Sequence, residues 1–199
     1  MSAVVEALRR VVVDLASIDG RVALVGGLAV SARAEPRFTR DLDFAVAVED
    51  DQEAERIVFA LQNQGYRVQM VLEQETTGRL ATVRLLPPRA TEDETLADLL
   101  FASSGIESEI VARADVLTVL PGLPIPVASV GHLIAMKVLS HDPERRPRDA
   151  EDLLALMAIA RSFDLDEARA ALNLIRVRGC GRGKDLDAEL ARFLPRAGR

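Results

Sequence analysis

VGGLAVSARAEPRFTRDLDFAV, residues Val25–Val46, is the stretch from which the fold of this chain is predicted. It follows on Arg21–Val25, an apolar run that is typical of a short buried strand. Gly26–Gly27 ends that strand, and Leu28–Ala34 is expected to form a helix that begins at the glycines. A second strand is expected at Asp41–Val48, with polar residues early and apolar residues later. The stretch therefore predicts a strand, a glycine turn, a helix and another strand.

Two aspartates, Asp41 and Asp43, open the second strand. Residues two apart point to the same face of a strand, so their carboxylates are expected side by side. Adjacent anions repel and raise each other's pKa unless a cation offsets their charge. Oxygen ligands at this spacing suit Mg²⁺, which binds one or two carboxylates together with substrate phosphates and water. Taken alone, such a pair is more often a solvated strand end.

Gly26–Gly27 lies where a phosphate can be bound. Backbone without side chains lets a phosphate approach the amides and the positive end of the helix dipole. A lone glycine pair is usually only a turn, but here a short loop links its helix to the aspartates. Arg37, Thr39 and Arg40 in that loop either contact phosphates or neutralise Glu35 and the aspartate pair, and the sequence favours neither alternative.

The rest of the chain predicts a mixed α/β core followed by helices. Helices are expected at Ala3–Ser17, from the capping residues Asp50 and Asp51 to about Asn63, and near Gly105–Ala112. Strands are expected at Tyr66–Leu72, Leu80–Leu86, Thr95–Ala102, Val116–Val119 and Ile125–Val127. Helices follow at Ser129–Ser140, Pro147–Ala160, Asp166–Arg176 and Asp185–Phe193. We therefore expect an α/β core over residues 1–128 and a C-terminal helical region over 129–199, packed with the core or separate from it.

The composition is that of a globular protein. The chain has 199 residues, of which 49% are hydrophobic, enough for a sizeable core. Its single cysteine, Cys180, allows no internal disulfide and no thiolate metal site, so we expect the cytoplasm. No stretch approaches the roughly 18 apolar residues of a membrane span, and charges interrupt the N-terminal helix, unlike a signal peptide. We therefore expect no membrane association.

The net charge of −6 argues against a protein that coats nucleic acid, because such binding rests on neutralising phosphates. The C-terminal end differs from the whole. From Ile175 to Arg199 there are three acidic residues and seven basic ones: Arg176, Arg178, Arg182, Lys184, Arg192, Arg196 and Arg199. This end is either a solvated helical tail or a contact for a polyanion.

The stretch Val25–Val46 resembles the signature of polymerase-β-like nucleotidyltransferases, and more narrowly that of AbiEii-type toxins of type IV toxin–antitoxin systems. The resemblance implies an α+β fold with a mixed sheet and flanking helices. It also implies that Gly26–Gly27 holds the triphosphate and that Asp41 and Asp43 bind two metal ions, Mg²⁺ or alternatively Mn²⁺.

One position departs from this pattern. Many members of the superfamily carry a serine after the two glycines, and its hydroxyl helps to hold the triphosphate, whereas this chain has Leu28. Ser31, one turn further on, is the expected substitute.

The family site includes a third carboxylate on a neighbouring strand, and Asp98 is the expected residue. The segment TLADLLF, Thr95–Phe101, resembles the strand that carries it in related proteins. The alternative is an edge strand on which Asp98 faces water. Weaker candidates, Glu92, Asp93 and Glu94, lie in the preceding loop.

The segment HLIAMKVLSHDPERRPRDAEDLLAL, His132–Leu156, resembles the lysine helix and the acidic helix of the same branch. Lys137 falls on an apolar helix face, where it either reaches the triphosphate or forms a structural ion pair. Pro147 suits the first residue of the next helix, and Arg148 is expected to contact a phosphate. Asp152 is expected to pair with Lys137, the alternative being activation of the acceptor hydroxyl.

The resemblance implies an enzyme that transfers a nucleoside monophosphate from an NTP to an acceptor hydroxyl at an RNA end, such as tRNA. As a toxin, such an enzyme has a cognate antitoxin as partner. A small-molecule acceptor such as an aminoglycoside, or a protein side chain, is the alternative with the same chemistry. A nucleotide-binding or antitoxin-like module without catalysis is the alternative from another class, and Leu28 favours it.

Overall fold

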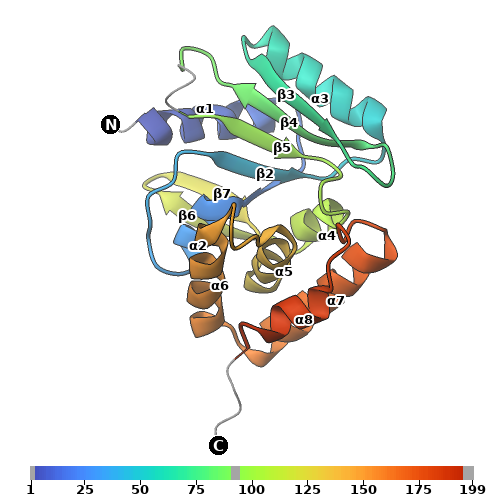
Figure 1. Ribbon diagram of the computed structural model, residues 1–199. Helices are drawn as coiled ribbons and strands as arrows, with labels where there is room; N and C mark the ends of the chain where they lie inside the picture. Colours follow the sequence, from blue (N-terminus) through green and yellow to red (C-terminus); the bar gives the residue numbers. More distant parts are fainter. Residues whose placement is uncertain (1–2, 91–94, 195–199) are drawn as a thin grey trace, which may run out of the picture.

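A computed structural model describes residues 3–90 and 95–194 of the chain (Figure 1). Its helices are α1 Ala3–Ser17, α2 Gly26–Arg33, α3 Asp51–Asn63, α4 Glu107–Ala112, α5 Val130–Ser140, α6 Pro147–Ile159, α7 Ser162–Val177 and α8 Leu186–Ala191. Its strands are β1 Val22–Val25, β2 Leu42–Val46, β3 Arg67–Glu73, β4 Leu80–Leu86, β5 Ala97–Leu100, β6 Asp115–Leu120 and β7 Leu123–Val127.

The described strands form one mixed sheet in the order β3-β4-β5-β2-β1-β7-β6. The pairs β2–β5 and β1–β7 are parallel, and the other neighbouring pairs are antiparallel. Strand β2 therefore lies inside the sheet, with β1 on one side and β5 on the other. In this register Asp43 of β2 is the direct partner of Asp98 of β5 and of Val25 of β1.

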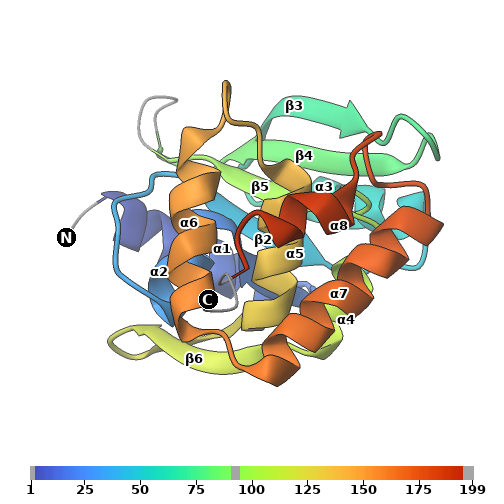
Figure 2. The same ribbon diagram turned by 60° about the horizontal axis from the view of Figure 1, so that its bottom comes forward.

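Helices cover both faces of the sheet. The views in Figures 1 and 2 place α1 and α3 on one face and the C-terminal helices α5–α8 on the other. Helix α2 leaves β1 on the same side as the C-terminal helices and contacts α5 and α6. No helix in the described ranges is long and apolar enough to cross a membrane.

One hydrophobic cluster joins the sheet to both helical layers. It includes Leu8 and Leu15 of α1, Phe44 of β2, Ile134 of α5 and Leu172 of α7, all at most 1% exposed. The C-terminal helices therefore share their core with the sheet. The division at residues 128 and 129 remains a prediction.

Most predicted elements are confirmed within one or two residues, and the exceptions have local causes. Helix α7 begins at Ser162 rather than Asp166, because Asp164 accepts a hydrogen bond from the backbone N–H of Arg161 at 2.8 Å and so caps the first turn. Strand β5 is shorter than predicted and lies between β4 and β2, so the edge-strand alternative for Asp98 is wrong. Asp41 immediately precedes β2 instead of opening it.

Candidate active site

A cavity of about 690 Å³ opens between the sheet and the helices α2, α5 and α6. Asp41, Asp43 and Asp98 line it from the sheet side, and Gly26 and Gly27 line it from the start of α2. Helix α5, the loop that follows it and the start of α6 form the opposite wall, with Lys137, Ser140 and the segment Arg145–Asp149. The residues predicted from the glycine turn, the aspartate pair and the lysine helix thus meet in one place.

The register of the sheet brings Asp43 and Asp98 together. They are direct partners on parallel strands, whose side chains point to the same face. Burial raises the pKa of Asp43 from 3.8 to about 7, and the negative charges of Asp98 and Asp41 add to the shift. Lys137 and Arg146 offset it only in part. The charge of Asp43 itself is therefore only partly neutralised by the cations around it.

Asp98 is already compensated by a cation. Arg84 of β4, its register partner on the other side, donates from Nε to Oδ1 at 2.7 Å and from Nη2 to Oδ2 at 2.6 Å. This fork engages both oxygens of the carboxylate, and it raises the pKa of Arg84 above its usual value. Of the two paired carboxylates, Asp43 is thus the one without such a partner in the described part of the chain.

Glycine is required at position 26 for two independent reasons. Its φ of +67° lies in the left-handed region, which residues with a side chain rarely adopt. A Cβ there would also lie 1.9 Å from Oδ2 of Asp43. At Gly27 a Cβ would lie 2.4 Å from Nη2 of Arg37. The turn therefore packs its backbone directly against the carboxylate of Asp43 and the guanidinium of Arg37.

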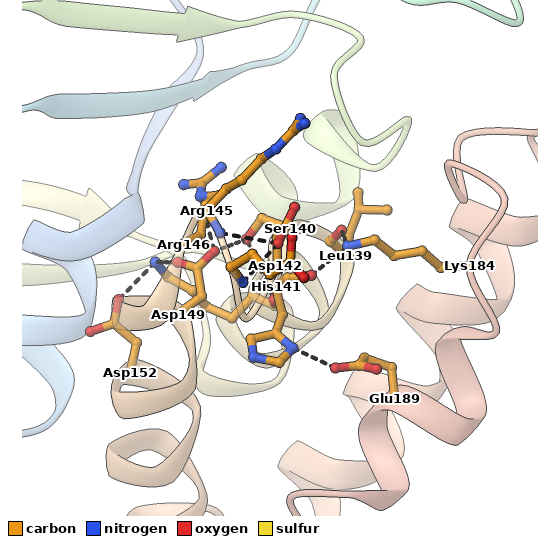
Figure 3. A network of polar contacts seen from close by, with 12 residues as sticks. Leu139, Ser140, His141, Asp142, Arg145, Arg146, Asp149, Asp152, Lys184 and Glu189 are labelled. Atoms are coloured by element: carbon orange, nitrogen blue, oxygen red, sulfur yellow. Dashed lines mark hydrogen bonds and ion pairs between the residues drawn. The ribbon is translucent and has the colours of Figure 1, made fainter.

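Lys137 is buried on α5 and bonded to Asp149 and Asp152 of α6, the two aspartates that Figure 3 labels. Its Nζ lies 2.7 Å from Oδ1 of Asp149 and 2.7 Å from Oδ2 of Asp152. Both carboxylates are at least 97% buried, so neither is solvated by bulk water. The expected pairing of Lys137 with Asp152 is present, and Asp149 is an additional partner.

Two further cations complete this buried network. Arg37 bonds both oxygens of Asp152, at 2.5 and 2.7 Å, and Arg146 lies 3.1 Å from Asp149. Burial raises the pKa of Asp152, but the hydrogen bonds from Arg37 and Lys137 outweigh it, and the net effect is a lowered pKa. The network joins the loop after α2 to α5 and α6, and so fixes one wall of the cavity.

The other predicted residues divide between the cavity and its surroundings. Thr39 and Arg148 line the cavity, whereas Ser31, Arg40 and Asp152 are not among its lining residues. The hydroxyl of Ser31 donates to the carbonyl of Gly27 at 3.1 Å and accepts from the backbone N–H of Arg37 at 3.2 Å. Arg40 stacks on Phe38, with 5.7 Å from its Cζ to the ring centroid. Ser31 thus supports the loop before the aspartates.

The remaining predicted positions either lie away from the cavity or fall outside the described residues. Leu28, at the position of the family serine, packs against the hydrophobic core. Glu92, Asp93 and Glu94, the weaker candidates for the third carboxylate, lie outside the described residues, as do Arg196 and Arg199 of the basic end.

Several residues of the site were not assigned to it by sequence reasoning. Arg84 interrupts an apolar strand, and the same signal that singled out Asp98 would have found it. Asp149 lies three residues before Asp152 on α6, a spacing that places both on one helix face. Arg182, in the loop before α8, lines the cavity although no motif connects it with the rest of the site.

The donor set suits a divalent metal that is held jointly with a substrate. In residues 3–90 and 95–194, no group of three or more His, Cys, Asp or Glu side chains is close enough to hold a metal ion. Arg84 occupies Asp98, which leaves Asp43 and the neighbouring Asp41 as oxygen donors. Mg²⁺ is usually bound by one or two carboxylates plus phosphate oxygens and water, so these residues fit it.

Comparisons with known proteins agree with this arrangement. The sequence model of a family described as "Nucleotidyl transferase AbiEii toxin, Type IV TA system" matches residues 7–198. No curated protein matches the chain significantly.

Solved structures that are similar to this chain have low sequence identity to it. An antigenic nucleotidyltransferase-like protein from Paracoccidioides brasiliensis has a TM-score of 0.51 at 19% identity, covering 98% of this chain and 95% of that one. The nucleotidyltransferase toxin MenT4 from Mycobacterium tuberculosis H37Rv has a TM-score of 0.47 at 16% identity, with coverages of 95% and 91%. The lincosamide antibiotic adenylyltransferase LnuA, solved with lincomycin, has a TM-score of 0.49 at 14% identity, with coverages of 78% and 97%.

Proposed function

Because the chain belongs to the AbiEii family of nucleotidyltransferase toxins, we propose that it transfers a nucleoside monophosphate from an NTP to the hydroxyl of an RNA end, such as that of tRNA. The reaction joins the acceptor oxygen to the α-phosphorus, breaks the bond from that phosphorus to the oxygen of the β-phosphate, and releases pyrophosphate. The proposed cofactor is Mg²⁺, with Mn²⁺ as a substitute.

One observation carries the proposal. Asp43 and Asp98 are paired across parallel strands, and Gly26 packs its backbone against Asp43. A phosphate on the amides of the turn would therefore lie next to these carboxylates. Anionic phosphates beside carboxylates repel each other unless a divalent cation lies between them, and this is the chemistry of nucleotidyl transfer.

The proposed roles follow from where each side chain lies. Asp41 and Asp43 would hold the metal, which supplies positive charge to the transferred phosphate when bound. Asp98 would join them if Arg84 releases it. Gly26 and Gly27 would bind phosphate oxygens through their amides at the start of α2.

The opposite wall would orient the nucleotide. Lys137 is held by Asp149 and Asp152, so its charge is shared with them and it would act chiefly by positioning α5 and α6. Thr39 and Arg148 line the cavity and would contact phosphates. Arg40 and Ser31 would act through the loop that places the aspartates.

An RNA acceptor is favoured by the charge of the cavity. Seven cationic side chains line it against four carboxylates, although the whole chain carries a net charge of −6. A cationic acceptor such as an aminoglycoside would meet net repulsion from these walls, whereas RNA would be attracted. The family description further supports a cognate antitoxin as the protein partner.

The test is transfer of labelled nucleotide. The purified protein is incubated with Mg²⁺, each α-labelled NTP in turn, and total tRNA, beside an Asp41→Ala variant. We expect label on RNA with the unmodified chain and none with the variant. Label on an added aminoglycoside or on protein would reassign the acceptor. Metal-dependent nucleotide binding without transfer to any acceptor would indicate a non-catalytic module.

A further inference from the structure

The cations of the cavity fall into two groups according to their partners. The seven are Arg37, Arg84, Lys137, Arg145, Arg146, Arg148 and Arg182. Four of them bond an aspartate: Arg84 bonds Asp98, and Arg37, Lys137 and Arg146 bond Asp149 or Asp152. The positive charges of these four residues are thus largely neutralised by aspartates of the protein itself.

Arg145, Arg148 and Arg182 have no carboxylate oxygen within 4.0 Å among the described residues. All three are exposed: Arg145 lies in the loop between α5 and α6, Arg148 in the first turn of α6, and Arg182 in the loop between α7 and α8. We name these three residues the arginine rim. Figure 3 shows Arg145 and its neighbour Arg146 extending from their loop toward the sheet.

Arg182 is held toward the cavity at a conformational cost. Its φ is +55°, a left-handed conformation that is uncommon for residues other than glycine, and glycines stand on both sides of it. Its Nη2 donates to the carbonyl oxygen of Ser103 at 3.4 Å and to the Ser103 hydroxyl at 3.3 Å, and Ser103 also lines the cavity. Partial burial lowers the pKa of Arg182, and the charge of Arg146 lowers it further. The charges of Glu107 and Glu75 oppose this shift only in part, and neither carboxylate forms an ion pair with Arg182.

We propose that the arginine rim binds the sugar–phosphate backbone of the RNA acceptor and directs its end toward Asp41 and Asp43. This inference rests on the proposed function. RNA is larger than the cavity and must extend past its mouth, where exposed arginines from two loops and the first turn of α6 can each contact a backbone phosphate. The triphosphate, in contrast, has the amides of Gly26 and Gly27 beside the aspartates. Through Arg182, the loop between α7 and α8 would thereby contribute to binding of the RNA acceptor.

The experiment measures RNA binding without nucleotide. A fluorescent tRNA acceptor-stem hairpin with a single-stranded 3′ end is titrated by anisotropy over a series of salt concentrations. The test variant is Arg145→Ala/Arg148→Ala/Arg182→Ala. The matched control is Arg56→Ala/Arg169→Ala/Arg176→Ala, which removes the same charge from exposed arginines outside the cavity lining. Thermal melting checks that each variant is folded.

We expect the rim variant to lose roughly tenfold or more in RNA affinity at 0.1 M salt, and its log–log salt slope to become about two units shallower, because about 0.7 counterions are released per phosphate contact with a single strand. The control variant should bind like the unmodified chain, apart from a small uniform loss. Binding of a non-hydrolysable NTP with Mg²⁺, followed by calorimetry, should be unchanged in the double variant Arg145→Ala/Arg182→Ala, which keeps Arg148 for the nucleotide.

Arg182→Gly gives a second, independent reading. Glycine adopts the observed φ without strain, so the melting temperature should stay within a few degrees while RNA affinity falls. If the rim and control variants bind RNA with equal affinity, and the unmodified protein does label RNA, the proposed role of the arginine rim is contradicted. The proposed function is not affected by that result. Loss of NTP binding with unchanged RNA binding would assign the rim to the triphosphate instead. An unmodified chain that neither binds nor labels RNA would contradict the RNA acceptor itself.

Discussion

At the scale of single residues, Asp43 links stability to function. Its pKa in the folded protein is about 7, against 3.8 for the unperturbed group. Between these values the folded state binds more protons than the unfolded state, so the free energy of unfolding falls as the pH rises through this window. Above about pH 7 Asp43 is ionised in the folded protein and lowers the free energy of unfolding by the full amount, up to ~4 kcal/mol for a pKa shift of this size.

We therefore predict that Asp43→Asn stabilises the metal-free protein at pH 8 and abolishes nucleotide transfer. The neutral amide removes the repulsion with Asp41 and Asp98 but is a poor metal ligand. Urea unfolding at pH 5 and pH 8 in the presence of EDTA measures the effect, which should be larger at pH 8. Asp41→Asn, at an exposed position, is the control and should change stability by no more than about 0.5 kcal/mol. A variant that is less stable at pH 8 would contradict the assigned burial of charge.

The same residue makes metal binding depend on pH. A protonated carboxylate is not a metal ligand, so a metal and a proton compete for Asp43. With a pKa of about 7, the apparent affinity for Mg²⁺ should rise with pH and then level off above 7, being about tenfold weaker at pH 6 than at the plateau. Calorimetric titration with Mg²⁺ at several pH values measures this. An affinity that does not vary between pH 6 and 8 would remove Asp43 from the metal site.

Gly26 offers a matched comparison with Gly78, because both have φ +67°. An alanine at either position is strained by the backbone, at a cost on the order of 1 kcal/mol. At Gly78 a Cβ has nothing within 4 Å, whereas at Gly26 it would meet the Asp43 carboxylate. We predict that Gly26→Ala loses both transfer and Mg²⁺ affinity, while Gly78→Ala keeps both. Similar activity of the two variants would show that the turn does not support the site.

At the scale of elements, the buried network of Lys137, Asp149 and Asp152 joins α5 to α6, and Arg37 ties in the loop after α2. Removing one member of a buried charged network leaves its partners uncompensated. An isolated pair on the surface contributes little in comparison. The two cases can be compared within this chain.

We predict that Asp152→Ala lowers the free energy of unfolding by about 3 kcal/mol. Asp166→Ala, which removes an exposed partner of Arg169 on α7, should cost less than about 1 kcal/mol. Chemical unfolding of both variants makes the comparison. A small loss for Asp152→Ala would mean that water replaces the missing carboxylate. Double substitution of Lys137 and Asp152 should cost less than the sum of the single changes.

Elements were predictable where their signals are local. The capping residue Asp50 of α3 and Pro147 at the start of α6 fixed those helix ends, and the two prolines after Leu86 ended β4. The start of α7 was not predictable in this way. The capping bond is donated by the backbone N–H of Arg161 to the side chain of Asp164, which lies inside the helix. The residues immediately before Ser162 include no Ser, Thr, Asp or Asn that would mark the helix start in the sequence.

At the scale of the whole molecule, the family pattern predicted which distant segments meet. The glycine turn, the aspartates, Asp98 and Lys137 do line one cavity, as the resemblance implied. The pairing of Arg84 with Asp98, and the arrival of Arg182 from the far end of the chain, depend on sheet register and helix packing. Single-sequence patterns carry no information about either.

At this scale, the net charge of the chain differs from the local charge around the cavity. A net charge of −6 argues only against a protein that coats nucleic acid non-specifically, and the fold places seven cationic side chains around one cavity. The distribution of charged residues over the surface, rather than the net charge, determines which ligands the surface attracts. Association with RNA should therefore weaken steeply with added salt despite the acidic composition.

The central claim is that this site transfers a nucleoside monophosphate, and the position of the label in the NTP tests it most directly. The protein is incubated with Mg²⁺ and RNA, with the same NTP labelled in parallel on the α- or the γ-phosphate, beside Asp43→Asn as the folded, inactive control. The account predicts label on RNA from the α-phosphate only, and none with Asp43→Asn. Label transferred from the γ-phosphate, or transfer that survives in Asp43→Asn, would contradict it.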